Sequence, residues 1–308
     1  GVWLRMEGPE DDNVPLDYST DWQFFNPRAG MSFRWSERHR AFLSAAVGHR
    51  EPGRADIKEN IKNAWLTDVH DVALKPEKML DVEFGYSFQS EKVGASVNVY
   101  LMEYWDMLLE TGKLSNVGYA IKENVDRGWR RGLELCASYE PLKWLRADAN
   151  ITLSSNKIRD YKEYVQNVDT YDNWAMTGRT TMYEYGNSTM LMSPSVTGMM
   201  KLTFIPWKKA AVSIDGKYVG MQYLDNTMTL SRSIPSYFVS NLSVSHTFDL
   251  NRGSLGLALY VNNLFNNMYY ADGWCWKNII EEDGALVDGI GIYPQAPVNY
   301  MLKASYRF

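Results

Sequence analysis

The sequence predicts an all-β protein, an antiparallel up-and-down β-barrel whose strands cross a membrane. Three observations lead to this fold class. Apolar and polar residues alternate with period two in many segments, the connections between these segments alternate between short and long, and aromatic residues stand near the segment ends. Because successive side chains of a strand point to opposite faces, such alternation gives each strand one apolar and one polar face.

Twelve segments have this alternation. The final segment shows it most clearly, because its apolar positions end on a terminal phenylalanine, a placement that suits a strand tip in a membrane interface. Its apolar positions are Tyr300, Leu302, Ala304, Tyr306 and Phe308. The candidate strands are 1–6, 24–34, 40–50, 80–88, 94–104, 133–139, 146–154, 195–204, 211–218, 241–248, 255–262 and 298–308. Among the apolar positions, we expect Val82, Phe84, Tyr86, Leu242, Val244, Leu257 and Leu259 to face lipid.

The lengths of the connections give a second signal. Short connections are expected at 36–39, 90–92, 141–143, 206–208 and 249–253. Long connections are expected at 7–21, 51–78, 161–192, 226–236 and 268–296, with one of medium length at 111–120. Outer-membrane barrels have short periplasmic turns and long outer loops. If the C-terminus lies in the periplasm, every short turn falls on the periplasmic side, which favours a membrane barrel over a soluble sandwich.

Composition agrees with this fold class. No run of about eighteen uncharged apolar residues exists, so a helical span is excluded. The chain has 11 Trp and 20 Tyr, and Trp35, Trp105, Trp144 and Trp207 stand near strand ends, where interfacial girdles lie. The net charge of −5 argues against a nucleic-acid partner. The two cysteines, Cys136 and Cys275, are too few for a disulfide framework, and their redox state stays open.

Charged residues recur on the polar faces of the predicted strands. In a wide barrel they would line a lumen filled by water or by a plug domain, and opposite charges could pair across the wall. The residues expected to face the lumen or a plug are Glu83, Glu134, Arg146, Asp148, Lys201, Asp215, Lys217 and Lys303, together with Arg307.

Aromatic residues of the long outer loops are the candidates for ligand contact, because aromatic rings stack on flat or amphipathic ligands. One group is Tyr171, Trp174, Tyr183 and Tyr185, and the other is Trp274, Trp276 and Tyr293. The alternative is that these rings pack the loops together or belong to the outer girdle. No cofactor is expected.

Metal-ligating patterns are weak. The four histidines lack metal-ligand spacing, and only His70, in a long outer loop, is a candidate haem ligand. The acidic loop 7–21, which includes Asp11 and Asp12, could hold Ca²⁺ through carboxylate oxygens. A solvated histidine and a solvated acidic loop are the alternatives, and the sequence favours them.

A family resemblance follows from several short motifs that occur in order. They are NPRAG at 26–30, REP at 50–52, LKPEK at 74–78, NV at 124–125 with RGLE at 131–134, VNNLFNNMYY at 261–270 and YRF at 306–308. Together they resemble TonB-dependent outer-membrane receptors, and most closely those for iron complexes in Bacteroides-like bacteria. The penultimate and terminal strands of that family carry the last two motifs.

The resemblance implies a bacterial outer-membrane location and a twenty-two-stranded barrel with an N-terminal plug and a TonB box. The TonB complex would drive import of a ferric siderophore, with haem or cobalamin as the next cargo, and the barrel-assembly machinery would recognise the Phe308 strand. The chain opens in mid-strand without a signal peptide. We therefore expect residues 1–308 to be one barrel domain, about the last twelve strands, without plug or TonB box.

Two other functional classes stay open. One is a passive porin-like channel. The other is a complete twelve-stranded barrel, including an outer-membrane hydrolase, which would need a nucleophile and a base within hydrogen-bond reach. His246 has Ser243 and Ser245 nearby in sequence, but alternation places them on the opposite face, and no G-x-S-x-G motif is present. We therefore expect no enzymatic activity.

Overall fold

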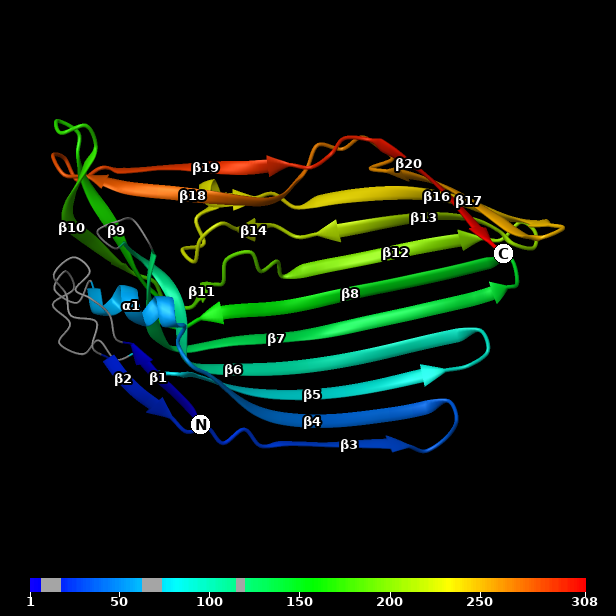
Figure 1. Cartoon of the computed structure of the whole chain (residues 1–308), viewed down its shortest axis with the longest axis horizontal. Coiled ribbons are helices and arrows are strands. Elements are labelled where there is room, and N and C mark those ends of the chain that lie inside the picture. The colour runs from blue at the N-terminus through cyan, green and yellow to red at the C-terminus, as the bar shows by residue number, and fades with distance from the viewer. Residues whose placement is uncertain (7–17, 63–73, 115–119) are drawn as a thin grey trace.

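The computed structural model describes residues 1–6, 18–62, 74–114 and 120–308. Its main feature is an antiparallel twelve-stranded sheet, with a layer of loops and short strands at one end (Figure 1). The order of the strands is β20-β17-β16-β13-β12-β8-β7-β6-β5-β4-β3, and the short β11 also pairs with β8. Strands that are neighbours in this order are also consecutive along the chain once the short strands inserted at the other end are left out. The sheet is therefore of the up-and-down type.

Eleven of the twelve predicted strands lie in this sheet. Its strands are β3 (Arg28–Arg34), β4 (His39–Arg50), β5 (Glu77–Gln89), β6 (Val93–Leu114), β7 (Ala120–Leu142), β8 (Leu145–Ile158), β11 (Ser188–Thr189), β12 (Val196–Phe204), β13 (Ala210–Val219), β16 (Tyr237–Leu250), β17 (Gly253–Asn262) and β20 (Asn299–Arg307). The β6 and β7 strands extend well beyond their predicted ends, because pairing continues past Asp106, whose φ of 51° interrupts the alternation.

The prediction for the first segment is wrong in one respect. It was expected to be a strand of the barrel, but β1 (Val2–Met6) pairs with β2 (Tyr18–Trp22) in a separate two-stranded sheet and does not belong to the large sheet. Met6 is buried against Ile57 and Leu108 of the loop layer. Alternation correctly indicated a strand with one buried face, but it carries no information about which partner covers that face.

The alternation of connection lengths is confirmed. Short turns at 35–38, 90–92, 143–144, 205–209 and 251–252 lie at the end of the sheet where the chain also ends (Figure 1). The connections at the opposite end contain the helix α1 (Arg54–Lys62) and the strands of the loop layer. No helix among the described residues is long and apolar enough to cross a membrane.

The sheet has one apolar and one polar face, in the predicted register. Phe84 pairs with Val99, and Val99 with Leu133, along the apolar face. On the same face, Leu257 stands opposite Ala304. The apolar side chains are only partly covered by protein, as Phe84 shows with 47% exposure. Lipid is the environment that suits such a face.

Aromatic rings form a belt on the apolar face at the short-turn end. Trp35 stacks on His39 with ring centroids 5.5 Å apart, and His39 Nδ1 lies 2.8 Å from the Tyr86 hydroxyl. Further along the belt are the pairs Trp144–Phe204, Trp207–His246, His246–Phe248 and Tyr306–Phe308. His246 thus packs among aromatic rings, and it faces away from Ser243 and Ser245. Three of the predicted girdle tryptophans lie in this belt, and Trp105 lies at the other end of the sheet.

The sheet is open within the described residues. β3 and β20 each pair on one side only, so the described strands do not close into a cylinder. This is the open sheet expected of part of a wider barrel, and it does not support a closed twelve-stranded barrel. Unpaired backbone groups at such edges need partners in a membrane.

The loop layer contains a second, four-stranded sheet in the order β10-β9-β18-β19. Its strands are β9 (Lys162–Asp169), β10 (Ala175–Glu184), β18 (Tyr270–Ile280) and β19 (Leu286–Pro294), and β9 and β18 run parallel. Beside it lie β14 (Gln222–Tyr223), the short 3-10 helix η2 (Leu230–Arg232) and β15 (Ser233–Ile234). Three segments that are far apart in the chain, β9–β10, β14–β15 and β18–β19, therefore meet in the loop layer.

Candidate functional site in the loop layer

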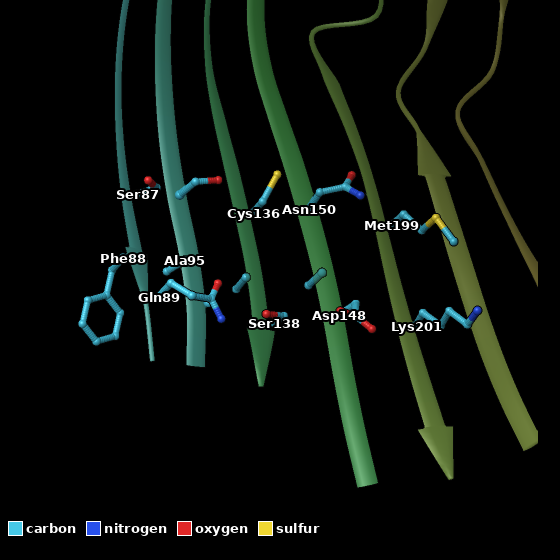
Figure 2. Close-up of a pocket in the computed structure, with 14 residues that line it drawn as sticks. Ser87, Phe88, Gln89, Ala95, Cys136, Ser138, Asp148, Asn150, Met199 and Lys201 are labelled. Carbon is cyan, nitrogen blue, oxygen red and sulfur yellow. The ribbon is translucent and has the colours of Figure 1, made fainter. Parts of the chain in front are cut away.

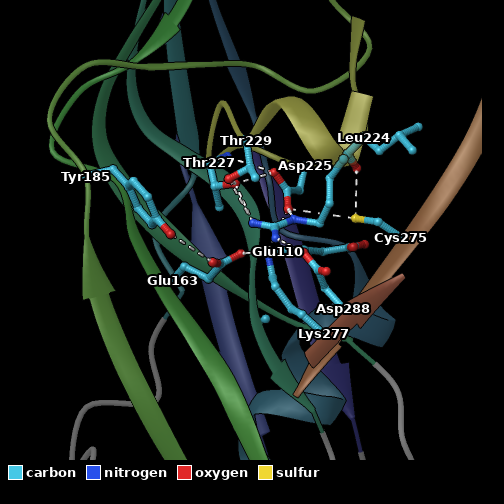
Figure 3. A network of polar contacts seen from close by, with 12 residues as sticks. Glu110, Glu163, Tyr185, Leu224, Asp225, Thr227, Thr229, Cys275, Lys277 and Asp288 are labelled. Carbon is cyan, nitrogen blue, oxygen red and sulfur yellow. Dashed lines mark hydrogen bonds and ion pairs between the residues drawn. The ribbon is translucent and has the colours of Figure 1, made fainter. Parts of the chain in front are cut away.

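Arg232 lies at the centre of the loop layer. It is 3% exposed, and its Nε donates to Asp225 Oδ2 at 2.7 Å, while Nη1 binds Asp288 (Figure 3). Nη2 donates to the hydroxyls of Thr227 and Thr229 at 2.9 and 3.0 Å. A buried guanidinium needs this many acceptors, because an unpaired charge out of water is costly.

Lys277 extends the network to the strand β9. Its Nζ donates to Asp225 Oδ2 at 2.7 Å and also binds Glu163. The hydroxyl of Tyr185 donates to Glu163 Oε2 at 3.4 Å. Two cations and three carboxylates thus tie the segments 159–195, 220–236 and 263–298 together.

The local sequence explains how Arg232 reaches this position. The Asp225 carboxylate accepts a hydrogen bond from the backbone N–H of Thr227 at 3.0 Å and from its hydroxyl at 2.6 Å. This is an Asx-type turn, in which the side chain replaces a backbone acceptor. Met228 follows with a φ of 60°. The tight turn brings Arg232 back over Asp225.

Burial and charge together set the pKa values in the network. Burial alone would raise the pKa of Asp225, but hydrogen bonds from Lys277 and Thr227 outweigh it and lower that pKa to about 2. For Glu163 burial dominates and raises the pKa, although Lys277 opposes it. Burial also raises the pKa of Tyr185 to about 12 and that of Cys275 to about 11. At neutral pH, Cys275 is therefore a neutral thiol.

Lys277 and Asp288 lie on one face of the β18–β19 hairpin. The opposite face carries three exposed rings, Trp274, Trp276 and Tyr293, which we call the aromatic surface. Their exposed fractions are 51%, 43% and 53%. Trp274 lies opposite Gly291 and Trp276 opposite Gly289. A Cβ at Gly291 would come within 2.4 Å of the Trp274 indole, and one at Gly289 within 2.7 Å of Trp276. Each indole therefore covers a glycine across the strand pair and leaves its outer side open.

The structure brings together only some of the predicted aromatic residues. Trp274, Trp276 and Tyr293 share one face, whereas Tyr171 and Trp174 lie in the β9–β10 turn, and Tyr171 is 89% exposed. Tyr183 lies in β10. Tyr185 is different, because its ring packs against Tyr161 and its hydroxyl is bound to Glu163. Whether any of these residues contacts ligand stays a prediction.

The sequence analysis missed the charged network. Asp225, Arg232, Lys277, Glu163 and Asp288 come from three distant segments and resemble solvated loop charges in the sequence. Only the Asp225-Asn226-Thr227 stretch carries a local signal, because such residues favour turns.

The polar face of the large sheet contains a hollow of about 580 Å³. Apart from Phe88 and Met199, small or polar side chains line it, and Figure 2 shows Ser87, Cys136 and Lys201 among them. Neither Cys136 nor Cys275 forms a disulfide bond, and the Cys275 thiol, in the loop layer, donates to Leu224 O at 3.7 Å. That a plug segment occupies this hollow stays a prediction.

All residues predicted to face the lumen lie on this polar face. In the strand register, Lys201 stands opposite Asp148 of β8 and Asp215 of β13. Lys217 stands opposite Met199, and Glu83 stands opposite Tyr100. Glu134 accepts a hydrogen bond from Asn98 at 3.3 Å. Arg146 binds Asp148 at 2.8 Å along the same strand, and Lys303 and Arg307 stand opposite Ala258 and Ser254. Contact of this face with a lumen or plug stays a prediction.

The candidate metal ligands His70, Asp11 and Asp12 lie outside the described residues. Within the described part of the chain, no three His, Cys, Asp or Glu side chains are grouped to hold a metal ion.

Comparison with known proteins places this architecture in a family. A family model described as "TonB dependent receptor-like, beta-barrel" matches residues 6–264. The comparison with curated proteins gives no match.

Solved structures share the fold. The ferric-catecholate import receptor Fiu of E. coli K12 is similar with a TM-score of 0.59 and 15% identity, over 94% of this chain and 35% of that one. The siderophore receptor PiuA of Acinetobacter baumannii has 0.62 and 14%, over 90% and 35%. The ferric citrate transporter FecA has 0.64 and 18%, over 92% and 38%.

The chain therefore spans 35–38% of the length of these three structures. At such low identity the likeness shows the fold, and the family model supplies the assignment. An open, up-and-down sheet with an apolar outer face, short turns at one end and a folded loop layer at the other agrees with both. The chain belongs to the TonB-dependent receptor β-barrel family, whose members are transport receptors of the outer membrane of Gram-negative bacteria.

Proposed function

We propose that the chain forms the C-terminal part of an outer-membrane receptor that imports a scarce iron complex. A ferric siderophore is the first candidate for the cargo, and haem or cobalamin comes next. Support comes from the family and from structural neighbours whose names describe ferric-catecholate import, siderophore reception and ferric citrate transport.

The observation that carries the proposal is the aromatic surface on β18–β19. Flat rings bind planar or amphipathic ligands by stacking and lose little entropy when they do so. The indoles lie over Gly289 and Gly291, and the opposite face of the same hairpin is fixed by Lys277 and Asp288 in the buried network. A surface held in this way is preorganised, which lowers the cost of binding.

The polar face of the large sheet supports the transport part of the proposal. Residues 1–308 would be a single barrel domain of a cylinder of about twenty-two strands, a size at which a plugged lumen is found. Glu83, Glu134, Lys201 and the other charges of this face would contact a plug and water. TonB would act through that plug, and the barrel-assembly machinery would recognise the strand that ends at Phe308.

Uptake by the full-length receptor tests the proposal. The receptor is expressed in an iron-starved host that lacks its own siderophore receptors, and uptake of radiolabelled ferric siderophores, haem and cobalamin is measured with and without TonB. We expect saturable uptake of one ferric siderophore that stops without TonB. Uptake that persists without TonB would indicate a porin-like channel. TonB-dependent uptake of haem or cobalamin alone would keep the receptor and correct the cargo.

A further inference from the structure

The aromatic surface of the β18–β19 hairpin has a carboxylate beside it and, among the described residues of that face, no cation. Asp272 stands opposite Tyr293 and, by strand alternation, lies on the same face as Trp274. Its side chain is exposed and accepts a hydrogen bond from the backbone N–H of Gly273 at 2.7 Å. It forms no ion pair with a described residue. The negative charge of Asp272 is therefore not compensated at the aromatic surface.

The cations of the loop-layer strands are engaged elsewhere. Arg232 and Lys277 belong to the buried network, which lies against the opposite face of the hairpin. The other two cations of β9, β10, β14, η2, β15, β18 and β19 each bind a carboxylate. These ion pairs are Lys162–Glu184 at 3.0 Å and Arg179–Glu281 at 2.8 Å. These described strands therefore leave no unpaired cation to meet an anionic ligand.

Further carboxylates stand at the tip of the hairpin. Glu282 accepts hydrogen bonds from the backbone N–H and the hydroxyl of Thr170 at 2.8 and 2.7 Å. Asp283 accepts one from the backbone N–H of Ala285 at 2.9 Å. Neither carboxylate forms an ion pair with a described residue. The aromatic surface thus lies between Asp272 at the base of the hairpin and two carboxylates at its tip, and this charge distribution repels anions.

Ferric siderophore complexes differ strongly in charge. Three hydroxamates, each deprotonated once, neutralise Fe³⁺, whereas three catecholates, each deprotonated twice, leave the complex strongly anionic. Catecholate rings stack on indoles as well, so stacking by itself does not favour the hydroxamate class. An anion that leaves water without a cationic partner loses its solvation, and nearby carboxylates add repulsion. Charge therefore decides between the two classes at this surface.

We propose that the aromatic surface selects an uncharged ferric complex of the tris-hydroxamate class, and that Asp272 is the residue that disfavours anionic complexes. This inference rests on the proposed function, because it takes the aromatic surface as the place where the cargo binds. It separates the chain from two of its structural neighbours, whose names describe the import of ferric catecholate and the transport of ferric citrate.

Equilibrium binding to the full-length receptor tests this selectivity. A radiolabelled uncharged ferric tris-hydroxamate and a ferric tris-catecholate are each titrated at low and at high salt. At low salt we expect the tris-hydroxamate to bind about tenfold more tightly. Added salt should raise the affinity for the tris-catecholate, because it screens the repulsion between like charges. An affinity for the tris-catecholate that falls with added salt would indicate a cationic site and overturn the inference.

Substitutions of Asp272 test its role through the ratio of the two affinities. Asp272→Asn should shift this ratio roughly threefold toward the tris-catecholate, and Asp272→Lys roughly tenfold. The matched control is Asp249→Asn, which removes a carboxylate with 70% side-chain exposure at the short-turn end and should leave the ratio unchanged. Because both affinities are measured on one preparation, a partial loss of folded receptor does not alter their ratio.

The outcomes separate this inference from the proposed function. Tighter binding of the tris-catecholate, by a receptor that binds both complexes, would overturn the inference and leave the proposed function in place. Binding of neither complex would overturn both. An unchanged ratio in the Asp272 variants, or an equal shift in the Asp249 variant, would show that Asp272 does not set the selectivity.

Discussion

The membrane sheet and the loop layer stabilise themselves in different ways. In the sheet, outward apolar side chains such as Phe84 and Leu257 are only partly covered by protein, and lipid completes their environment. In the loop layer, charged side chains are buried, with Arg232 and Glu163 each 3% exposed. An apolar side chain in lipid can be exchanged for another of similar polarity. A buried charge has no such freedom, because its partners must be in place.

The difference bears on function. The network of Arg232, Asp225, Lys277, Glu163 and Asp288 fixes the orientation of the β18–β19 hairpin, whose other face carries the aromatic surface. Structural specificity is therefore concentrated where ligand recognition is proposed. The sheet beneath supplies a scaffold that depends mainly on register and polarity.

The largest effect is expected from Arg232→Met. This change leaves Asp225, whose side chain is 12% exposed, with Lys277 as its remaining cation, and it removes Arg232 from the partly exposed Asp288. Removing one partner from a buried ion pair costs about 3–5 kcal/mol, and Lys277 keeps this loss near the lower end of that range. We expect amide hydrogen exchange to accelerate in residues 220–236 and 270–294, while the strands of the large sheet stay protected. Arg179→Met is the control, because Arg179 binds Glu281 at 2.8 Å on the surface with 71% of its side chain exposed. If both variants behave alike, the network does not hold the loop layer.

In the sheet, Leu257→Arg should cost about 2–4 kcal/mol, because it places a cation against the middle of the bilayer. The control is Ala258→Arg, whose side chain points to the polar face. Folding into lipid vesicles at increasing urea concentrations measures the difference. A larger loss for Ala258→Arg would mean that the two faces are assigned the wrong way round.

Acidification should loosen the loop layer through Asp225. Its pKa in the folded protein, about 2, lies below the ordinary value of 3.8, so its ionised form stabilises the fold. This contribution of about 2 kcal/mol is complete above about pH 4 and is lost as the pH falls toward 2. Glu163 acts with the opposite sign, because its raised pKa favours the protonated form in the folded state. Limited proteolysis of the loops between pH 5 and 2 measures the effect.

The Asp225→Asn variant is the control for the acid effect. It should already be loosened at pH 5 and should lose little more on acidification. An unchanged acid response in this variant would assign the response to another group.

The smallest effect is expected at the aromatic surface and concerns binding. Trp274→Ala and Trp276→Ala should each weaken binding of the imported complex by about 1–2 kcal/mol, as measured by fluorescence titration of the full-length receptor. Trp207→Ala, which removes an exposed indole from the short-turn belt, should leave affinity unchanged. Trp174→Ala tests the β9–β10 turn separately. Unchanged affinity in the Trp274 and Trp276 variants would leave these indoles with a packing role.

The sequence by itself determined the strands, their faces and the parity of the connections. Eleven of twelve predicted strands lie in the sheet, and Glu83, Asp148 and Lys201 share its polar face as expected. These features follow from period-two alternation and from turn length, which are local properties of the chain. The short motifs that occur in order between residues 26 and 308 are also local features of the chain, and they indicated the family.

Only the tertiary structure decided which distant segments meet. It paired Val2–Met6 with Tyr18–Trp22, placed Tyr185 on Glu163, and brought Asp225, Lys277 and Arg232 into one buried network. In the sequence a loop charge that will be buried looks the same as one that stays in water. Its burial depends on partners more than fifty residues away, as with Lys277 and Asp225, and such contacts form only when the whole loop layer is assembled.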